Sequence, residues 1–197
     1  MEFDREMLPP PSMYETLVQI CRELNARMVE YLVAGGNAVA AHGYPRGTND
    51  IDMVVGLKPA NLEQAMSALQ ELGYASQHAP VPVKEFCSPA FREMCRTEKG
   101  AQVFSFFDPN DPRRLTVDVF LTEPFDFDAE YTAAEHIDLA DGVSMPVVRL
   151  ETLIAMKRSA GRPKDLLDVA ELLAANPRIG LPDSGPSRKN RSLEYPI

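Results

Sequence analysis

The 197-residue sequence contains no tryptophan and only three cysteines and three histidines. Cys21, Cys87 and Cys95 form no CxxC pair, and the histidines are scattered along the chain. An odd number of isolated cysteines argues against a disulfide framework, and scattered histidines argue against a zinc site. We therefore expect the cysteines to be structural.

Long hydrophobic runs are also missing from the sequence. None approaches the roughly 20 apolar residues that a membrane helix needs. The first residues, MEFDREMLPPP, are acidic and proline-rich, whereas a secretory signal is basic and then apolar. These features lead us to expect a cytoplasmic protein.

Basic residues are few compared with acidic ones. The chain has 20 Lys and Arg against 29 Asp and Glu, a formal net charge of −9. This balance disfavours nonspecific nucleic-acid binding, which depends on many Lys and Arg contacts to phosphates. A local basic patch could still bind RNA, and basic residues do cluster at Arg113-Arg114, at Lys157–Lys164 and at 188–191.

The composition that is present is typical of a globular chain, with 45% hydrophobic and 25% charged residues. The length suits one domain with a sizeable core. We divide the chain into a leader (1–11), a core (12–149), two C-terminal helices that pack on the core (150–175) and a tail (176–197).

Periodicity and turn residues predict the main elements of this core. A Ser12-x-x-Glu15 capping box starts a first helix, and Pro59 starts another that ends at Gly73. The region 75–100 gives no clear pattern. The remaining predictions are strands at 31–34 and 50–55, a helical turn at 38–41, strand hairpins at 101–107 with 115–121 and at 136–140 with 143–148, and C-terminal helices meeting at Gly161 and Pro163.

Two carboxylates, Asp50 and Asp52, lie at alternate positions of one predicted strand. Alternate strand residues share a face, while Ile51 and Met53 point into the core. Like charges held this close call for a cation, and oxygen ligands favour Mg²⁺. The preceding Gly35-Gly36 would let backbone N–H groups approach a phosphate closely. Together these features indicate a nucleotide substrate.

Asp118 is a lone carboxylate within the apolar strand LTVDVFL. An acid at such a position is costly unless it is paired or metal-bound. We interpret Asp118 as a third acid of the same site. The alternative is an outward-facing, solvated residue.

The motif as a whole resembles a known signature. A Gly-Gly pair, a gap of thirteen residues and then Asp-hydrophobic-Asp-hydrophobic is similar to the motif of the DNA polymerase β superfamily of nucleotidyltransferases. Gly43-x-x-Arg46-x-Thr48-x-Asp50 and the later stretch 157–168 more narrowly resemble AbiEii-like minimal nucleotidyltransferases, many of which are toxins of toxin-antitoxin pairs. The resemblance spans residues 31–173.

This resemblance implies an α/β (α+β) nucleotidyltransferase fold, with a short mixed sheet flanked by helices and a helical C-terminal segment. It implies Mg²⁺-dependent transfer of a nucleoside monophosphate from an NTP to a hydroxyl. The expected catalytic and metal-binding residues are Asp50, Asp52 and Asp118, and the expected nucleotide-binding residues are Gly35, Gly36, Asn37, Arg46, Thr48 and Lys157.

Several of these residues have a simpler interpretation. Arg46 could be a solvated loop charge, and Lys157 could be a surface lysine favoured by the end of its helix. His42 is more easily explained as a packed or solvated side chain than as a base. Asp165 and Asp168 could bind nearby Lys and Arg or contribute to the site. Seven acids between Glu123 and Asp141 indicate a solvated face, or a surface for a basic partner.

The acceptor has three interpretations. The basic stretch after Lys157 favours RNA such as tRNA, in a toxin-antitoxin context with a cognate antitoxin. A small-molecule acceptor of the aminoglycoside type would use the same chemistry. A third possibility is a non-catalytic protein of this fold that binds a nucleotide or a partner; the retention of three acids argues against it. The preferred NTP and the oligomeric state stay open.

Overall fold

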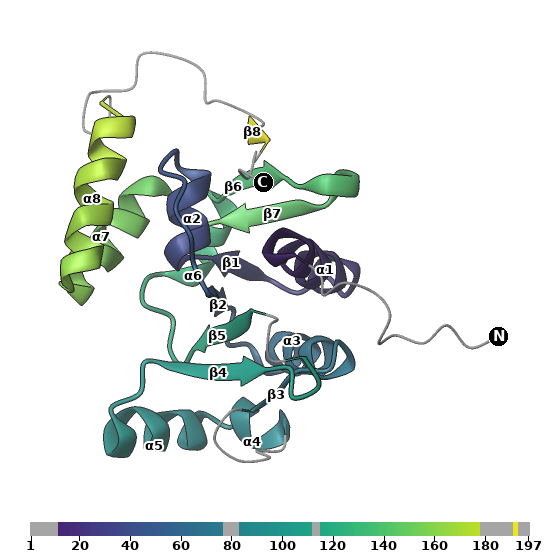
Figure 1. The fold of residues 1–197 in the computed structure, drawn as a ribbon. Coiled ribbons are helices and arrows are strands. Elements are labelled where there is room, and N and C mark those ends of the chain that lie inside the picture. Colours follow the sequence, from purple (N-terminus) through teal and green to yellow (C-terminus); the bar gives the residue numbers. More distant parts are fainter. Residues whose placement is uncertain (1–11, 77–82, 112–114, 178–190, 193–197) are drawn as a thin grey trace.

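A mixed β-sheet forms the centre of the molecule in this computed structural model, which describes residues 12–76, 83–111, 115–177 and 191–192 (Figure 1). Within these ranges the sheet has eight strands in the order β3-β4-β5-β2-β1-β7-β6-β8. Their bounds are β1 (Tyr31–Val33), β2 (Asp50–Val55), β3 (Ala75–Ser76), β4 (Val103–Phe107), β5 (Thr116–Phe120), β6 (Glu135–Asp138), β7 (Ser144–Val147) and β8 (Arg191–Ser192).

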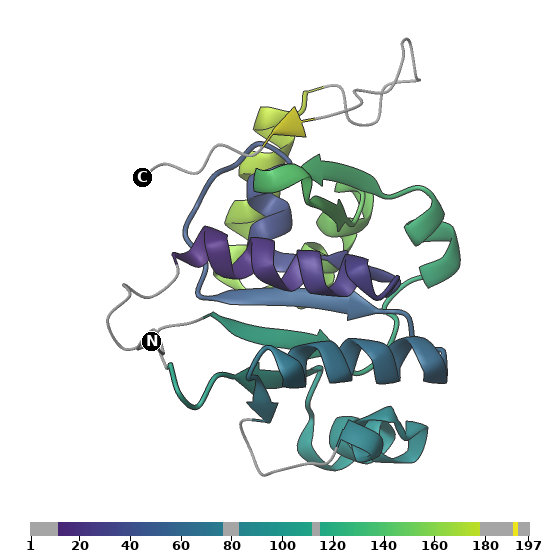
Figure 2. The same ribbon diagram turned by 90° about the vertical axis from the view of Figure 1, so that its right-hand side faces the viewer.

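Strand pairing is parallel for β1 with β7, β2 with β5, and β6 with β8, and antiparallel for the other neighbours. Helices lie on both sides of the sheet, as Figures 1 and 2 show. They are α1 (Met13–Ala26), α2 (Gly35–Ala41), α3 (Pro59–Glu71), α4 (Val83–Cys87), α5 (Pro89–Lys99), α6 (Phe127–Thr132), α7 (Leu150–Ala160) and α8 (Pro163–Ala175). The predicted mixed α/β fold is confirmed.

Helix α1 begins as its sequence predicts. The Ser12 hydroxyl accepts a hydrogen bond from the Glu15 backbone N–H (3.2 Å), and the Glu15 carboxylate accepts one from the Ser12 N–H (2.6 Å). This capping box satisfies two N–H groups that a helix start leaves free. The buried face of α1 then packs with α3 against the sheet.

Alternation along the central strands separates the core from the site. Ile51 and Met53 of β2 and Val117 and Val119 of β5 are buried, with at most 1% of their surface exposed. The residues between them, including Asp52 and Asp118, are only partly buried and face the other side of the sheet. The predicted hairpins β4–β5 and β6–β7 are also present, both antiparallel.

Two regions differ from the predictions. Helix α2 begins at Gly35 itself and not at Ala38, so the tandem glycines form its first turn. The region without a clear pattern contains β3, α4 and α5. Helix α5 has Ser88 as its N-cap and Pro89 in its first turn, a start signal that the surrounding polar sequence obscured.

The C-terminal helices begin and end at the proline and glycine residues that the sequence predicts. Helix α7 ends at Gly161, whose φ of +64° suits glycine, and Pro163 begins α8. The predicted leader (1–11), Arg113-Arg114 and most of the tail lie outside the described residues. In the part of the chain that is described, no helix has the length and apolar character needed to cross a membrane.

Candidate active site

The three acids of the sequence motif meet on one face of the sheet. Strands β2 and β5 are parallel neighbours, with Asp52 directly opposite Asp118 and Asp50 opposite Thr116. Since alternate positions share a face, Asp50, Asp52 and Asp118 all lie on the side away from the buried Ile51 and Met53. Two separate segments thus bring three negative side chains together.

The electrostatics of these acids reflect their closeness. Burial, and then the charges of Asp50 and Asp118, raise the pKa of Asp52 from 3.8 to about 6, although Lys157 and Lys164 partly offset the effect. Burial also raises the pKa of Asp118, against a hydrogen bond from Ser105. One oxygen of Asp118, Oδ1, is buried without a hydrogen-bond partner. A buried carboxylate oxygen in this state is suited to a cation or a donor from a substrate.

Gly35 and Gly36 allow α2 to pack directly against these acids. Gly35 has a φ of +56°, and a Cβ added there would lie 1.6 Å from Asp52 Oδ2. A Cβ on Gly36 would lie 2.5 Å from the Thr48 hydroxyl. Neither position accepts a side chain without moving the site, because such approaches are far inside van der Waals contact.

Asp50 is held by its neighbours in two ways. Its carboxylate oxygen Oδ1 accepts a hydrogen bond from the Thr48 hydroxyl at 2.5 Å. The Asn37 side-chain amide donates to the Asp50 backbone carbonyl at 3.0 Å, which ties α2 to the start of β2. Asn37 is 2% exposed, so in this structure it supports the strand from the interior.

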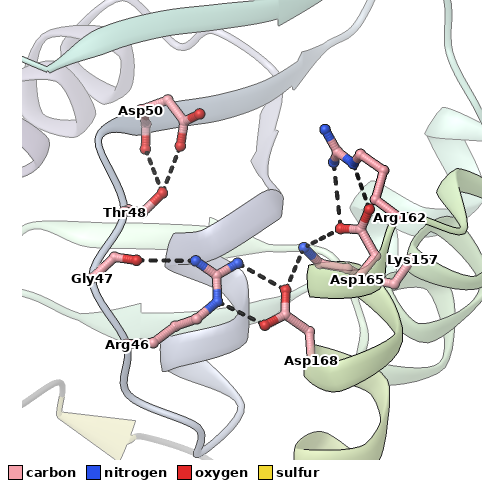
Figure 3. A network of polar contacts seen from close by, with 8 residues as sticks. All are labelled: Arg46, Gly47, Thr48, Asp50, Lys157, Arg162, Asp165 and Asp168. Carbon is pink, nitrogen blue, oxygen red and sulfur yellow. Dashed lines mark hydrogen bonds and ion pairs between the residues drawn. The ribbon is translucent and has the colours of Figure 1, made fainter.

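A network of ion pairs connects the loop before β2 to α7 and α8 (Figure 3). Arg46 binds Asp168 with both ends of its guanidinium, Nε to Oδ1 at 2.7 Å and Nη2 to Oδ2 at 2.8 Å. Lys157 Nζ lies 2.8 Å from Asp168 Oδ2 and 3.1 Å from Asp165 Oδ1. Arg162 completes the network by donating from Nε to Asp165 Oδ2 at 2.5 Å.

The two aspartates of this network remain ionised despite their burial. Burial alone would raise the pKa of Asp168, but hydrogen bonds from Arg46 and Lys157 bring it below its usual value. Asp165 behaves in the same way with Arg162 and Lys157. Lys157 is 6% exposed, so the interpretation as a surface lysine is wrong. Arg46 is likewise held by a carboxylate and is not a free loop charge.

The donor set suits a hard divalent cation such as Mg²⁺. Asp50, Asp52 and Asp118 offer only oxygens, their mutual repulsion calls for a cation, and Asp118 Oδ1 is without a partner. Within the described ranges, however, no three or more His, Cys, Asp or Glu side chains already form a cluster that could hold a metal. The hydrogen bond from Thr48 engages one oxygen of the Asp50 carboxylate, which is consistent with the absence of such a preformed cluster.

Two further residues clarify the site. His42 is buried and its Nε2 lies 2.8 Å from the Val148 carbonyl, so it is a packed residue away from the acids, as the sequence favoured. Ser105 was not identified from the sequence, yet it lies opposite Asp118 on β4. Its strand reads VFSFF without clear alternation, so only the observed register reveals this pairing.

Solved structures with a similar fold are nucleotidyltransferases. Lincomycin-bound lincosamide antibiotic adenylyltransferase LnuA superposes with a TM-score of 0.53 and 14% identity, over 82% of this chain and 96% of that one. ANT(2″)-Ia in complex with adenylyl-2″-tobramycin gives a TM-score of 0.54 and 11% identity, over 84% and 90%. An antigenic nucleotidyltransferase-like protein from Paracoccidioides brasiliensis gives a TM-score of 0.52 and 14% identity, over 84% of this chain and 76% of that one.

At these identities the structures establish the fold alone. No curated protein matches the sequence. The family model described as "Nucleotidyl transferase AbiEii toxin, Type IV TA system" matches residues 23–181, which include every strand from β1 to β7 and both C-terminal helices. A match over this much of the chain shows that the protein belongs to the AbiEii family of nucleotidyltransferase toxins.

Proposed function

We propose that this nucleotidyltransferase transfers a nucleoside monophosphate from an NTP to a hydroxyl group of RNA, such as tRNA. Asp50 and Asp52 would hold Mg²⁺, and Asp118 would complete the site. The observation that carries the proposal is the register of β2 and β5, which sets Asp118 opposite Asp52 with its Oδ1 unpaired. Mg²⁺ bound there would neutralise the phosphates and the developing charge of the leaving group.

Asp118 acts on the acceptor in this proposal. Its carboxylate would accept the proton of the attacking hydroxyl as the new bond between the hydroxyl oxygen and the α-phosphorus forms. The bond between the α-phosphorus and the bridging oxygen then breaks, and pyrophosphate leaves. The raised pKa of Asp118 suits this role, because a carboxylate of higher pKa is the stronger base.

Glycines and cations accommodate the triphosphate. Gly35 and Gly36 let the backbone of the first turn of α2 approach Asp52 and Thr48 closely, and the N–H groups of such a turn are suited to a phosphate. The charge of Lys157 lowers the pKa of Asp52, so Lys157 offsets negative charge in the site even while it is paired with Asp165 and Asp168. Arg46 binds Asp168 of α8, and Thr48 donates a hydrogen bond to Asp50, so both residues hold the loop before β2 in place beside the acids.

The charge around the site favours RNA over a polycationic antibiotic. Arg158, Arg162 and Lys164 are exposed at the junction of α7 and α8. Lys164 lowers the pKa of Asp52, and the charges of Asp52 and Asp50 raise the pKa of Arg162. Lys164 and Arg162 therefore lie within electrostatic range of the acids. A rim of this sign attracts phosphates and repels amines. The family also implies a cognate antitoxin.

The test is a labelling experiment with each α-labelled NTP, Mg²⁺ and separate pools of RNA, protein, aminoglycosides and other metabolites. We expect label in the RNA pool, and its loss in Asp50→Asn, Asp52→Asn and Asp118→Asn. Asp141→Asn, an exposed acid remote from the site, is the matched control. Label in the antibiotic pool would show the small-molecule alternative, and Mg-NTP binding without any product would show a non-catalytic protein. Undiminished activity in the three site variants would refute the assignment of the acids.

A further inference from the structure

The site-facing side of β4 and β5 continues beyond the acids. Ser105 pairs with Asp118, and Val103 pairs with Phe120 in the same register. Because alternate residues share a face, Val103, Ser105 and Phe107 of β4 lie on the same face as Asp118 and Phe120 of β5. We call Val103, Phe107 and Phe120 the β4–β5 shelf.

The shelf is apolar, and its side chains are partly exposed. The neighbouring Phe104 and Phe106 point to the opposite side, where their rings lie 5.1 and 5.8 Å from the ring of the buried Phe86. Phe104 and Phe106 belong to or pack against the hydrophobic core, and Phe120 of the shelf also packs against it, whereas Val103 and Phe107 do not. Among the described residues, a partly open apolar surface thus lies beside a catalytic carboxylate.

On the other side of the acids, α2 packs directly against them. Gly35 of α2 abuts Asp52, and Lys157 of α7 acts on the same carboxylate. Helices α2, α7 and α8 lie together on that side in Figure 1, next to β1 and β7. An NTP seated beside Gly35 and Gly36 therefore leaves the direction of β4 and β5 for the acceptor, with Asp118 between the two.

We propose that the β4–β5 shelf binds the terminal nucleobase of the RNA acceptor, so that its hydroxyl reaches Asp118. This inference rests on the proposed function and specifies the acceptor's contact surface. Aromatic side chains stack on any base, because every base has a π-face. Ser105, which lies between Val103 and Phe107 on this face, has a small side chain. The cationic residues Arg162 and Lys164 across the acids are suited to the phosphates of the same strand.

Phe107→Ala tests the shelf through a split of kinetic constants. We expect the KM for RNA to rise about tenfold or more, the size of effect that loss of one stacking contact gives. The KM for NTP and Mg-NTP binding should stay within about twofold of the wild type, since the NTP lies on the α2 side of the acids. Phe107→Tyr should restore the RNA KM because it retains the ring. Met28→Ala, at an 87% exposed residue, is the control.

Each outcome decides the proposal. An RNA KM within twofold of the wild type in both Phe107→Ala and Val103→Ala would overturn the shelf, whereas labelling of RNA that still needs Asp118 would leave the proposed function standing. Label transferred only to an aminoglycoside, or to no acceptor, would overturn both the RNA acceptor and the base on the shelf. Urea unfolding of each variant shows whether a weaker RNA KM comes from misfolding. If Phe107→Ala does not fold, the proposal is tested with Phe107→Tyr, which keeps the ring and should keep the wild-type RNA KM.

Discussion

At the residue scale, Asp52 makes folding depend on pH. Its pKa of about 6 in the folded protein lies above the ordinary 3.8. The folded state therefore binds this proton more tightly than the unfolded state does, and the contribution to stability is lost as pH rises from about 4 to about 6. Asp52 thus lowers the free energy of unfolding above that window, unless a cation compensates its charge.

Asp52→Asn should remove this penalty. Without metal at about pH 8, we expect the variant to be more stable than the wild type by up to about 3 kcal/mol, the equivalent of a shift of roughly two units. The gap should narrow below about pH 4, and Mg²⁺ should stabilise the wild type but not the variant. Urea unfolding measures both effects. A variant that is less stable than the wild type by the same amount at every pH would show that the charge carries no penalty.

The glycines give a second prediction at this scale. Gly35→Ala places a methyl group on Asp52 and forces a left-handed backbone that costs about 1–2 kcal/mol for other residues. A misplaced Asp52 should reduce labelling about a hundredfold. Gly47→Ala is the matched control, because a Cβ there meets no heavy atom within 4 Å. Equal activity in the two variants would contradict the role of Gly35.

Single residues show how far the sequence could be interpreted. Asp118 was predicted as a third acid because a lone carboxylate in an apolar strand is costly unless it is paired or metal-bound, and the register of β2 and β5 places it opposite Asp52. Glu130 was misjudged: it was counted with the solvated acids, yet it is 2% exposed and accepts hydrogen bonds from Arg149 and Thr152. A run of acids identifies a charged segment but does not show which member meets a cation from elsewhere in the chain.

At the scale of elements, the ion-pair network holds α8 to the loop before β2. Asp168 is the shared anion of Arg46 and Lys157, and its side chain is only 2% exposed. Asp168→Asn leaves the buried Lys157 and the partly buried Arg46 with one negative partner fewer, which should cost about 3 kcal/mol or more. The exposed pair Arg22–Asp141 offers a control, and Asp141→Asn should change stability by less than about 1 kcal/mol. Similar losses in the two variants, measured by urea unfolding, would contradict a structural role of the network.

Elements were easier to predict than their pairing. The strands at 50–55 and 115–121 follow from their apolar alternation, and α7 and α8 follow from Gly161 and Pro163. The parallel pairing of β2 with β5 brings together segments that are far apart in the sequence, and no local pattern encodes that register. For the same reason the partners of Lys157 were left open, because they depend on how α8 folds back against α7.

At the scale of the whole molecule, a net charge of −9 and an RNA acceptor must be reconciled. Nonspecific attraction to RNA is weak for such a chain, so binding has to rely on a few well-placed cations. The exposed candidates at the junction of α7 and α8 are Arg158, Arg162 and Lys164, and the last two interact electrostatically with the acids. Everything else in the affinity must come from contacts that do not depend on salt, which is the role proposed for the β4–β5 shelf.

This division predicts a shallow dependence of RNA binding on salt. Three phosphate contacts at about 0.7 each give a slope of about two for log KM against log salt. The KM for RNA should therefore rise about 15-fold between roughly 50 and 200 mM salt. Lys164→Ala should reduce the slope by about 0.7, whereas Lys58→Ala, at an exposed lysine beyond the far end of β2, should leave it unchanged. A wild-type slope of about six or more would mean that RNA is bound chiefly through phosphates on another surface.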